Sequence, residues 1–142
     1  MSSEPASEIG IVPLSPAIGA EIGDVDLSET LDDGTFATIY QAWLDYGVLR
    51  FCGQRLGDAD LVAFSRRFGD LDLAPVKGHG QAAVEGFPEV FVISNVIEDG
   101  VSIGSLGDDE LAWHSDMAYV ETPPKASCLY SLSVAESGGE TG

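Results

Sequence analysis

One apolar stripe, between residues 34 and 46, places the firmest constraint on how this chain folds. Its members recur at the i, i+3, i+4, i+7 and i+8 positions that form one helix face, and they are Phe36, Ile39, Tyr40, Trp43 and Leu44. Asp32 or Asp33 can cap the start of such a helix, and Gly47 can stop it. The sequence therefore predicts an amphipathic helix over residues 34–46.

A second helix is predicted over about residues 58–68. Asp58 and Asp60 fall in its first turn and Arg66 and Arg67 in its last, so the charges match the helix dipole at both ends. The residues expected to face the core are Leu61, Phe64 and Phe68, and Gly69 is expected at the C′ position.

Short strands and turns account for most of the remaining chain. Gly (17 residues) and Pro (7 residues) are frequent, which suggests many turns and a β-rich fold. Apolar runs between turn residues predict strands at 9–14, 20–27, 48–51, 89–94 and 126–135, with a further short strand near Val101 to Ile103. On the last long strand one face would comprise Cys128, Tyr130, Leu132 and Val134.

The length and composition fit one globular domain. The chain has 142 residues, of which 44% are hydrophobic, and this is enough for a real core. Residues 1–8 are expected to be a polar tail, residues 9–142 to form the domain, and residues 70–88 and 95–110 to be loop-like. Mostly short strands with a few helices make this an α+β chain.

The charge excludes two classes of partner. The formal net charge is −18, from 24 acidic and 6 basic side chains, so the surface repels nucleic acid and anionic membranes. No apolar run reaches the length of a membrane span, and the first residues show no signal peptide. Cys52 and Cys128 have no CxxC spacing, and we expect them to be buried free thiols. Together these features favour a cytoplasmic protein.

His114 and Asp116, in the stretch Ala-Trp-His-Ser-Asp-Met, are the candidate metal ligands. Residues i and i+2 of an extended segment project from the same face, so an imidazole and a carboxylate can converge on one ion. They would supply two of the three protein ligands of a 2-His-1-carboxylate iron site. By itself the pair is also compatible with a histidine that is hydrogen-bonded to a nearby carboxylate.

Three ordered motifs give the pair its context. Trp113 to Asp116 is followed by Thr122-Pro123-Pro124, then by an apolar strand, then by Gly138-Gly139-Glu140-Thr141. In this order and spacing the chain resembles the taurine dioxygenase (TauD/TfdA-like) family of Fe(II)- and 2-oxoglutarate-dependent dioxygenases. The upstream stretches YGVLRF, FSRRFGDL and VFVISNVIEDG are similar to the N-terminal half of that family, so the resemblance runs from about residue 9 to residue 142.

The resemblance implies a fold, a reaction and a set of site residues. The fold would be a double-stranded β-helix, or jelly roll, flanked by helices, and His114 and Asp116 would bind Fe(II). Thr141 would meet a carboxylate of 2-oxoglutarate, and Asn95 would lie near the cofactor or substrate. As alternatives, Thr141 is a turn residue and Asn95 closes a strand through an Asx-turn. Dioxygen and a small organic substrate would be the other reactants, with hydroxylation of an unactivated C–H bond.

Two parts of the family's site have no counterpart in these 142 residues. The distal iron-binding histidine and the arginine that grips 2-oxoglutarate both come well after the Gly-Gly-[Asp/Glu]-Thr stretch in the family. His79 is not a substitute, because glycines flank it and the family's third ligand comes from a late strand. We therefore expect an incomplete jelly roll, the N-terminal half of a dioxygenase domain, with little turnover by itself.

Two other functions are compatible with the same residues. The chain could be a non-catalytic truncated domain that acts through its open sheet edge, including by forming a homo-oligomer. It could also use His114 and Asp116 in a zinc hydrolase, but further ligands at metal spacing are missing nearby. The sequence does not identify the substrate; taurine itself is disfavoured, because Ala74-Pro75-Val76-Lys77 stands where taurine dioxygenases carry a His-Pro-x-Tyr stretch.

Overall fold

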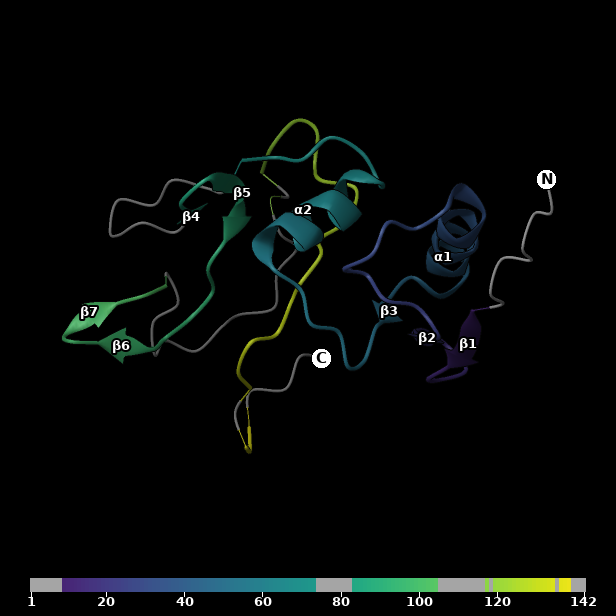
Figure 1. Ribbon diagram of the computed structural model, residues 1–142, viewed down its shortest axis with the longest axis horizontal. Coiled ribbons are helices and arrows are strands. Elements are labelled where there is room, and N and C mark those ends of the chain that lie inside the picture. Colours follow the sequence, from purple (N-terminus) through teal and green to yellow (C-terminus); the bar gives the residue numbers. More distant parts are fainter. Residues whose placement is uncertain (1–8, 74–82, 105–116, 118, 135, 139–142) are drawn as a thin grey trace. The chain divides into compact units, whose positions relative to one another are not determined.

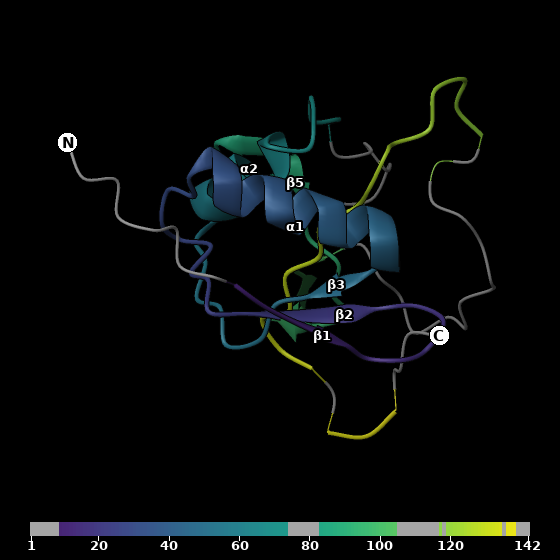
Figure 2. The same cartoon turned by 90° about the vertical axis from the view of Figure 1, so that its right-hand side faces the viewer.

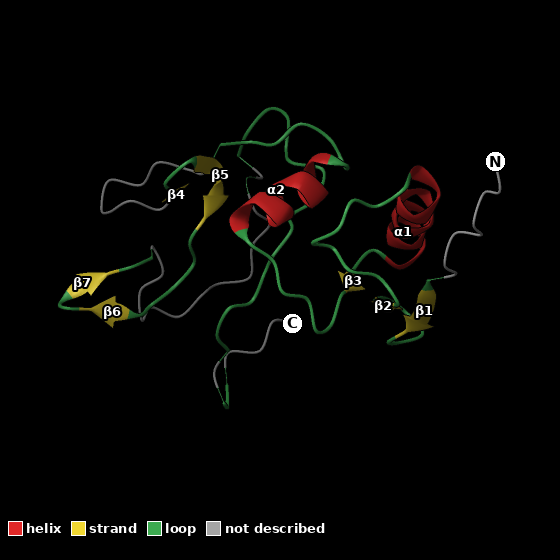
Figure 3. Cartoon of the chain, in the orientation of Figure 1, coloured by secondary structure: helices red, strands yellow, loops and turns green. Residues whose placement is uncertain are grey.

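The computed structural model describes residues 9–73, 83–104, 117, 119–134 and 136–138. It divides the chain into two compact units, residues 1–112 and residues 113–142, which are described separately below. The described elements, which Figures 1 and 3 label, are β1 (Gly10–Pro13), β2 (Ala20–Gly23), α1 (Asp33–Tyr46), β3 (Leu49–Arg50), α2 (Asp58–Arg66), β4 (Ala83–Val84), β5 (Phe87–Phe91), β6 (Ile97–Glu98) and β7 (Val101–Ser102).

Strands β1, β2 and β3 form a sheet in that order, with α1 against it. β1 and β2 are antiparallel and pair Ile11 with Ile22, whereas β2 and β3 are parallel and pair Ala20 with Leu49. Parallel neighbours need a crossover connection, and α1 provides it. Figure 2 shows α1 running across the sheet, and it contacts β2 and β3.

The core of this unit lies between α1, α2 and the sheet. Its buried apolar residues come from the strands, the loop after β2 and both helices, and they are Ile9, Ile22, Leu27, Ile39, Ala42 and Phe64. Ile39, in the middle of α1, is completely buried (0% exposed). The expected helix over 34–46 is therefore confirmed, and it packs as an amphipathic helix should.

The buried face of α1 differs from the predicted stripe. The residues that α1 buries are Thr35, Ile39 and Ala42, whereas Leu44 is 57% exposed. Phe36 and Trp43 are half-buried and pack edge-on against Phe68, with ring centroids 5.0 and 5.7 Å apart respectively. Of the predicted stripe, Ile39 thus packs in the core, and Phe36 and Trp43 pack against Phe68. Leu44 is exposed, so its predicted place on the buried face was wrong.

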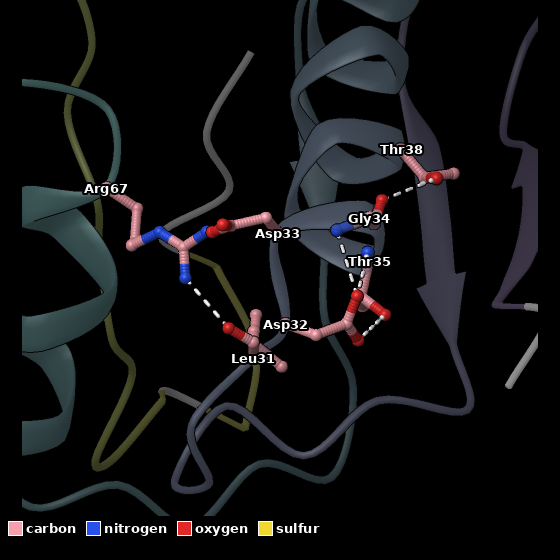
Figure 4. A network of polar contacts seen from close by, with 7 residues as sticks. All are labelled: Leu31, Asp32, Asp33, Gly34, Thr35, Thr38 and Arg67. Atoms are coloured by element: carbon pink, nitrogen blue, oxygen red, sulfur yellow. Dashed lines mark hydrogen bonds and ion pairs between the residues drawn. The ribbon is translucent and has the colours of Figure 1, made fainter. Parts of the chain in front are cut away.

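The first turn of α1 is held by a polar network (Figure 4). The Asp32 carboxylate accepts hydrogen bonds from the backbone N–H groups of Gly34 and Thr35 and from the Thr35 hydroxyl. These donors are the ones that a helix leaves unpaired at its start. The Thr35 hydroxyl and N–H hold the pKa of the Asp32 carboxyl below its usual value.

Arg67 joins the end of α2 to the start of α1. Its guanidinium donates to the Leu31 carbonyl at 2.8 Å and pairs with the Asp33 carboxylate at 2.9 Å (Figure 4). The same group lies 4.4 Å from the centre of the Phe36 ring. Arg67 therefore connects the end of α2 to the start of α1.

α2 begins as predicted and ends earlier. Asp60 accepts the Gly57 backbone N–H at 2.8 Å, which closes the first turn. The regular helix ends at Arg66, because the next amide groups bond three residues back, which tightens the last turn. Arg67 is the C-cap, so Gly69 lies one residue beyond the C′ position that was expected for it.

Strand β5 begins before the predicted strand. It spans Phe87–Phe91 and pairs with β4, which lies in the stretch 70–88 that was predicted to be a loop. Gly86, at φ 83°, makes the tight turn between them. Pro88 is tolerated because, among the described residues, the sheet has two strands and both are edge strands.

A second hairpin follows in the stretch that was predicted to be mostly loop. β6 and β7 pair through an Asp99-Gly100 turn in which both residues have positive φ, 50° and 79°. This is the geometry of the type I′ turn that favours Asp-Gly in hairpins. The predicted short strand near residue 101 is confirmed, and β6 was missed.

The described residues of the second unit, 117, 119–134 and 136–138, contain no strand, so the strand predicted at 126–135 is not found there. The Cys128 side chain is exposed, as is that of Cys52 in the first unit, so the expectation of buried thiols was wrong. The described chain is thus α+β, in small open sheets, and the jelly roll remains a prediction. None of its helices is long and apolar enough to cross a membrane.

Candidate metal and cofactor site

The predicted iron ligands and Thr141 lie outside the residues that the structure describes. This holds for His114 and Asp116, and His79, the other histidine of the chain, lies outside them as well. Among the described residues no group of three or more His, Cys, Asp or Glu side chains could hold a metal ion. That result says nothing about the predicted iron site, because the described residues include no histidine.

Asn95 is the one predicted site residue that the structure describes. It is exposed, and it lies four residues after the end of β5. Its side chain has no hydrogen-bond partner within the described part of the chain, whereas the Ser94 hydroxyl accepts the Val96 backbone N–H at 3.1 Å. The turn is therefore made by Ser94, and the alternative in which Asn95 forms an Asx-turn was wrong.

A close backbone approach holds the base of the β6–β7 hairpin beside Asn95. A Cβ atom placed on Gly104 would lie 2.6 Å from the Ser94 nitrogen and 2.8 Å from the Ser94 oxygen. These distances leave no room for any side chain, and the atoms that would be met are backbone atoms that cannot swing away. Residue 104 must therefore be glycine for the chain to pass this close to Ser94.

A turn begins directly after the predicted ligand pair. Met117 has a φ of 50°, and its carbonyl accepts the Val120 backbone N–H at 3.1 Å. Positive φ is uncommon for a side chain such as methionine and often occurs where function fixes the backbone. The sequence did not predict the strained residue.

The other two motifs also carry backbone geometry that suits their residues. Thr122 and Pro123 are exposed and in irregular backbone, as expected for a proline pair, which restricts the residue before each ring to extended conformations. Gly138, the first residue of Gly-Gly-Glu-Thr, has a φ of 78°. Glycine adopts this conformation without a steric cost, which accounts for its place before Thr141.

Three of the described arginines are engaged in ion pairs within the first unit. Arg50 pairs with Glu21, Arg66 pairs with Glu89 at 2.6 Å, and the third is Arg67. Hydrogen bonding and charge attraction from Arg50 hold the pKa of the Glu21 carboxyl below its usual value. The same two interactions with Glu21 raise the pKa of the Arg50 guanidinium.

Comparison with known proteins identifies close relatives. The model of the family described as "Taurine catabolism dioxygenase TauD, TfdA family" matches residues 10–142. An alkylsulfatase from Acinetobacter baylyi is 34% identical over 138 residues, which are 96% of this chain and 39% of that protein. An (S)-phenoxypropionate/alpha-ketoglutarate-dioxygenase from Sphingobium herbicidovorans is 32% identical over 140 residues, 93% of this chain and 43% of that protein.

A solved structure shows the same similarity. A taurine dioxygenase from Burkholderia xenovorans superposes with a TM-score of 0.54 and 41% sequence identity, over 63% of this chain and 31% of that protein. The chain spans about two fifths of the length of the curated relatives it matches. The match to the family model includes every predicted site residue, from Asn95 to Thr141.

Proposed function

Because the chain belongs to the taurine catabolism dioxygenase TauD, TfdA family, we propose that it is the N-terminal portion of an Fe(II)- and 2-oxoglutarate-dependent dioxygenase that hydroxylates a C–H bond of a small organic substrate. The observation that carries this proposal is the family match over residues 10–142, which includes the three motifs at residues 113–116, 122–124 and 138–141. Relatives that are named as alpha-ketoglutarate-dependent enzymes, for phenoxypropionate and for 2,4-dichlorophenoxyacetate, act on small organic molecules.

The donor set of the chain fits ferrous iron in part. His114 and Asp116 offer one neutral nitrogen and one anionic oxygen, which are two of the three protein ligands of a facial triad. The turn at Met117 supports the idea that an extended segment delivers both ligands and then ends. The third ligand would come from the part of the family domain that this chain does not span.

Bound iron would supply the oxidation, in which 2-oxoglutarate, dioxygen and R–H give succinate, CO2 and R–OH. The residues of the chain have other tasks. His114 and Asp116 fix the geometry and leave coordination positions open. The Thr141 hydroxyl would donate to a carboxylate of 2-oxoglutarate, and Gly138 would set the backbone turn that leads to it. Asn95, whose amide has no described partner, would donate to the co-substrate or the substrate.

The jelly roll and a cytoplasmic location belong to the same proposal. The described sheets are open and small, so the closed double-stranded β-helix would need further strands. The absence of a membrane-spanning helix among the described residues is compatible with a cytoplasmic enzyme.

One observation favours a second function for the polypeptide as it stands. Every apolar residue that is buried in the described structure lies between Ile9 and Phe64, and none lies in the second unit. Packed residues around a site hold its ligands in fixed positions, and the described part of the second unit has no buried residue to provide such packing. The chain by itself would then be a non-catalytic domain that binds another polypeptide and shows little turnover.

Iron binding by the purified chain tests the proposal. Anaerobic titration with Fe(II) should show weak binding that His114→Ala abolishes, because the imidazole nitrogen is one of only two protein donors. His79→Ala is the matched control, since it removes the other histidine of the chain and should leave binding unchanged. Equal binding by both variants would refute the assignment of His114, and would point to general attraction of the cation by the acidic surface.

A further inference from the structure

Two Asp-Gly pairs occur in the chain, and the structure places them in different backbone surroundings. They are Asp33-Gly34, at the start of α1, and Asp99-Gly100, in the turn of the β6–β7 hairpin. Because glycine has no side chain, its backbone nitrogen can reach the carboxyl group of the preceding aspartate and attack it. All four residues are exposed, so access to water does not distinguish the two pairs.

This attack is a balanced reaction that needs no reactant besides water. The glycine nitrogen forms a bond to the aspartate Cγ and loses its proton, while the carboxyl hydroxyl leaves as water, which gives a five-membered succinimide ring. Water then opens the ring at one of its two carbonyl groups. Opening at Cγ restores aspartate, whereas opening at the main-chain carbonyl gives isoaspartate, in which the main chain runs through Cβ and Cγ.

The fold restrains Asp33-Gly34 at both reacting groups. Ring closure requires rotation about the Asp33 Cα–C bond, which the helical backbone of α1 opposes. The Gly34 N–H, which carries the attacking nitrogen, donates to the Asp32 carboxylate at 2.9 Å. The Asp33 carboxylate, which would be attacked, pairs with the Arg67 guanidinium at 2.9 Å (Figure 4). The nitrogen and the carboxylate are therefore both held in other contacts.

The fold restrains Asp99-Gly100 much less. β6 and β7 have two residues each, and among the described residues they pair with no third strand. A two-stranded hairpin by itself is marginally stable, so its turn opens by local fluctuation. A Cβ atom placed on Gly100 would have nothing within 4 Å, so the surroundings of this glycine are open.

We propose that Asp99 is a site of spontaneous isomerisation to isoaspartate, and that this modification releases the β6–β7 hairpin. Isoaspartate adds one carbon atom to the main chain, and a two-residue type I′ turn does not accommodate the added length. The pairing that the turn keeps in register would be lost, including the 3.1 Å hydrogen bond from the Ile103 N–H to the Val96 carbonyl. This chemistry does not depend on the proposed function.

Ageing of the purified full chain tests the proposal. One sample is kept folded in mildly acidic buffer at physiological temperature, and a second is kept unfolded in urea. Peptide mapping by electron-transfer mass spectrometry, whose fragments distinguish isoaspartate from aspartate, then follows both pairs. In the folded chain isoaspartate should form at Asp99 at least about tenfold faster than at Asp33, because the capped helix must open first. In urea the two rates should be similar, since the fold no longer separates the pairs.

Two variants separate the effect of the fold from that of the local sequence. Asp99→Glu keeps the carboxylate but would have to close a six-membered ring, which is slower, so isomerisation at residue 99 should disappear. Asp32→Ala removes the acceptor of the Gly34 N–H, so isomerisation at Asp33 should become at least about twofold faster, with no change at Asp99. In aged wild-type protein that carries isoaspartate, the Ile103 amide should exchange with solvent faster than in fresh protein.

Three results would count against the proposal. Equal rates at the two pairs in the folded chain would overturn it, because position in the fold would then have no effect. It would also be overturned if Asp99 stays unmodified in the folded chain while both pairs isomerise in urea, since the hairpin would then protect its own turn. If the Ile103 amide of the isomerised protein keeps its exchange rate, the modification does not release the hairpin.

Discussion

Replacing Ile39 with alanine should destabilise the first unit by about 3 kcal/mol. Ile39 is 0% exposed, so the change removes three buried carbon atoms. At roughly 0.8 kcal/mol per buried CH2 group the transfer loss is about 2.4 kcal/mol. An unfilled cavity adds to this loss, and buried isoleucine-to-alanine changes as a class cost roughly 2–5 kcal/mol. The higher helix propensity of alanine returns only a few tenths of a kcal/mol.

Leu44→Ala is the matched control, because the sequence pattern places Leu44 on the same stripe whereas the structure leaves it 57% exposed. Its effect should stay within about 0.5 kcal/mol. Urea unfolding, followed by the helical circular dichroism signal, measures both free energies. Equal losses for the two variants would refute the described orientation of α1, since they would mean that the helix buries both residues to a similar extent.

Three other predictions concern the turns and caps. Gly104→Ala should lower the free energy of unfolding by about 1–3 kcal/mol and shift the amide resonances of β6 and β7, because its Cβ would meet backbone atoms of Ser94. Gly23→Ala is the control and should be tolerated, because a Cβ on Gly23 would have nothing within 4 Å. Equal effects of the two changes would contradict the close approach of residue 104 to Ser94. Asp32→Ala should lower the melting temperature, since it removes the acceptor for three donors of α1. Because folding lowers the pKa of Asp32, its contribution to stability should be complete above the unfolded pKa of about 3.9 and disappear as the pH falls through the folded pKa. A stability difference between the wild type and Asp32→Ala that grows on acidification would contradict this.

The sequence predicted helices and turns where the determinants are local. The Asp32 cap, the Gly47 stop and the first turn of α2 all depend on residues within one or two turns, and each is present in the structure. The Asp99-Gly100 turn is also local. Asp-Gly is a pair that favours type I′ hairpin turns, so it could have predicted the strand β6 that precedes it.

Features that depend on distant partners were harder to predict. Leu44 and Ile39 share a sequence stripe, but the position of the sheet decides which of them is buried. Residues 126–134 have the alternating pattern of a strand, but a strand forms only where a neighbouring strand is present to pair with it, and the pattern does not show whether one is. The burial of Cys52 and Cys128 was mispredicted for the same reason. Both have apolar neighbours in the sequence, but both side chains are exposed in the structure.

The candidate site was predicted almost entirely from the order of its motifs. His114, Asp116 and Thr141 were identified by the resemblance, and they fall within the residues that the family model matches. Asn95 was identified in the same way, and the structure adds that its side chain is exposed beside a glycine-dependent hairpin base. The strained backbone of Met117 has no signature in a single sequence, because methionine rarely adopts positive φ.

Succinate release tests the central claim most directly. The full chain is fused after Gly142 to the carboxyl-terminal part of the Acinetobacter baylyi alkylsulfatase that the match to this chain leaves uncovered. In this fusion, succinate should form only when Fe(II), 2-oxoglutarate and dioxygen are all present. His114→Ala should abolish its formation, and His79→Ala should not. If the fusion forms no succinate, or if the fusion with His114→Ala forms as much succinate as the unaltered fusion, the assignment of this chain to a dioxygenase iron site is contradicted.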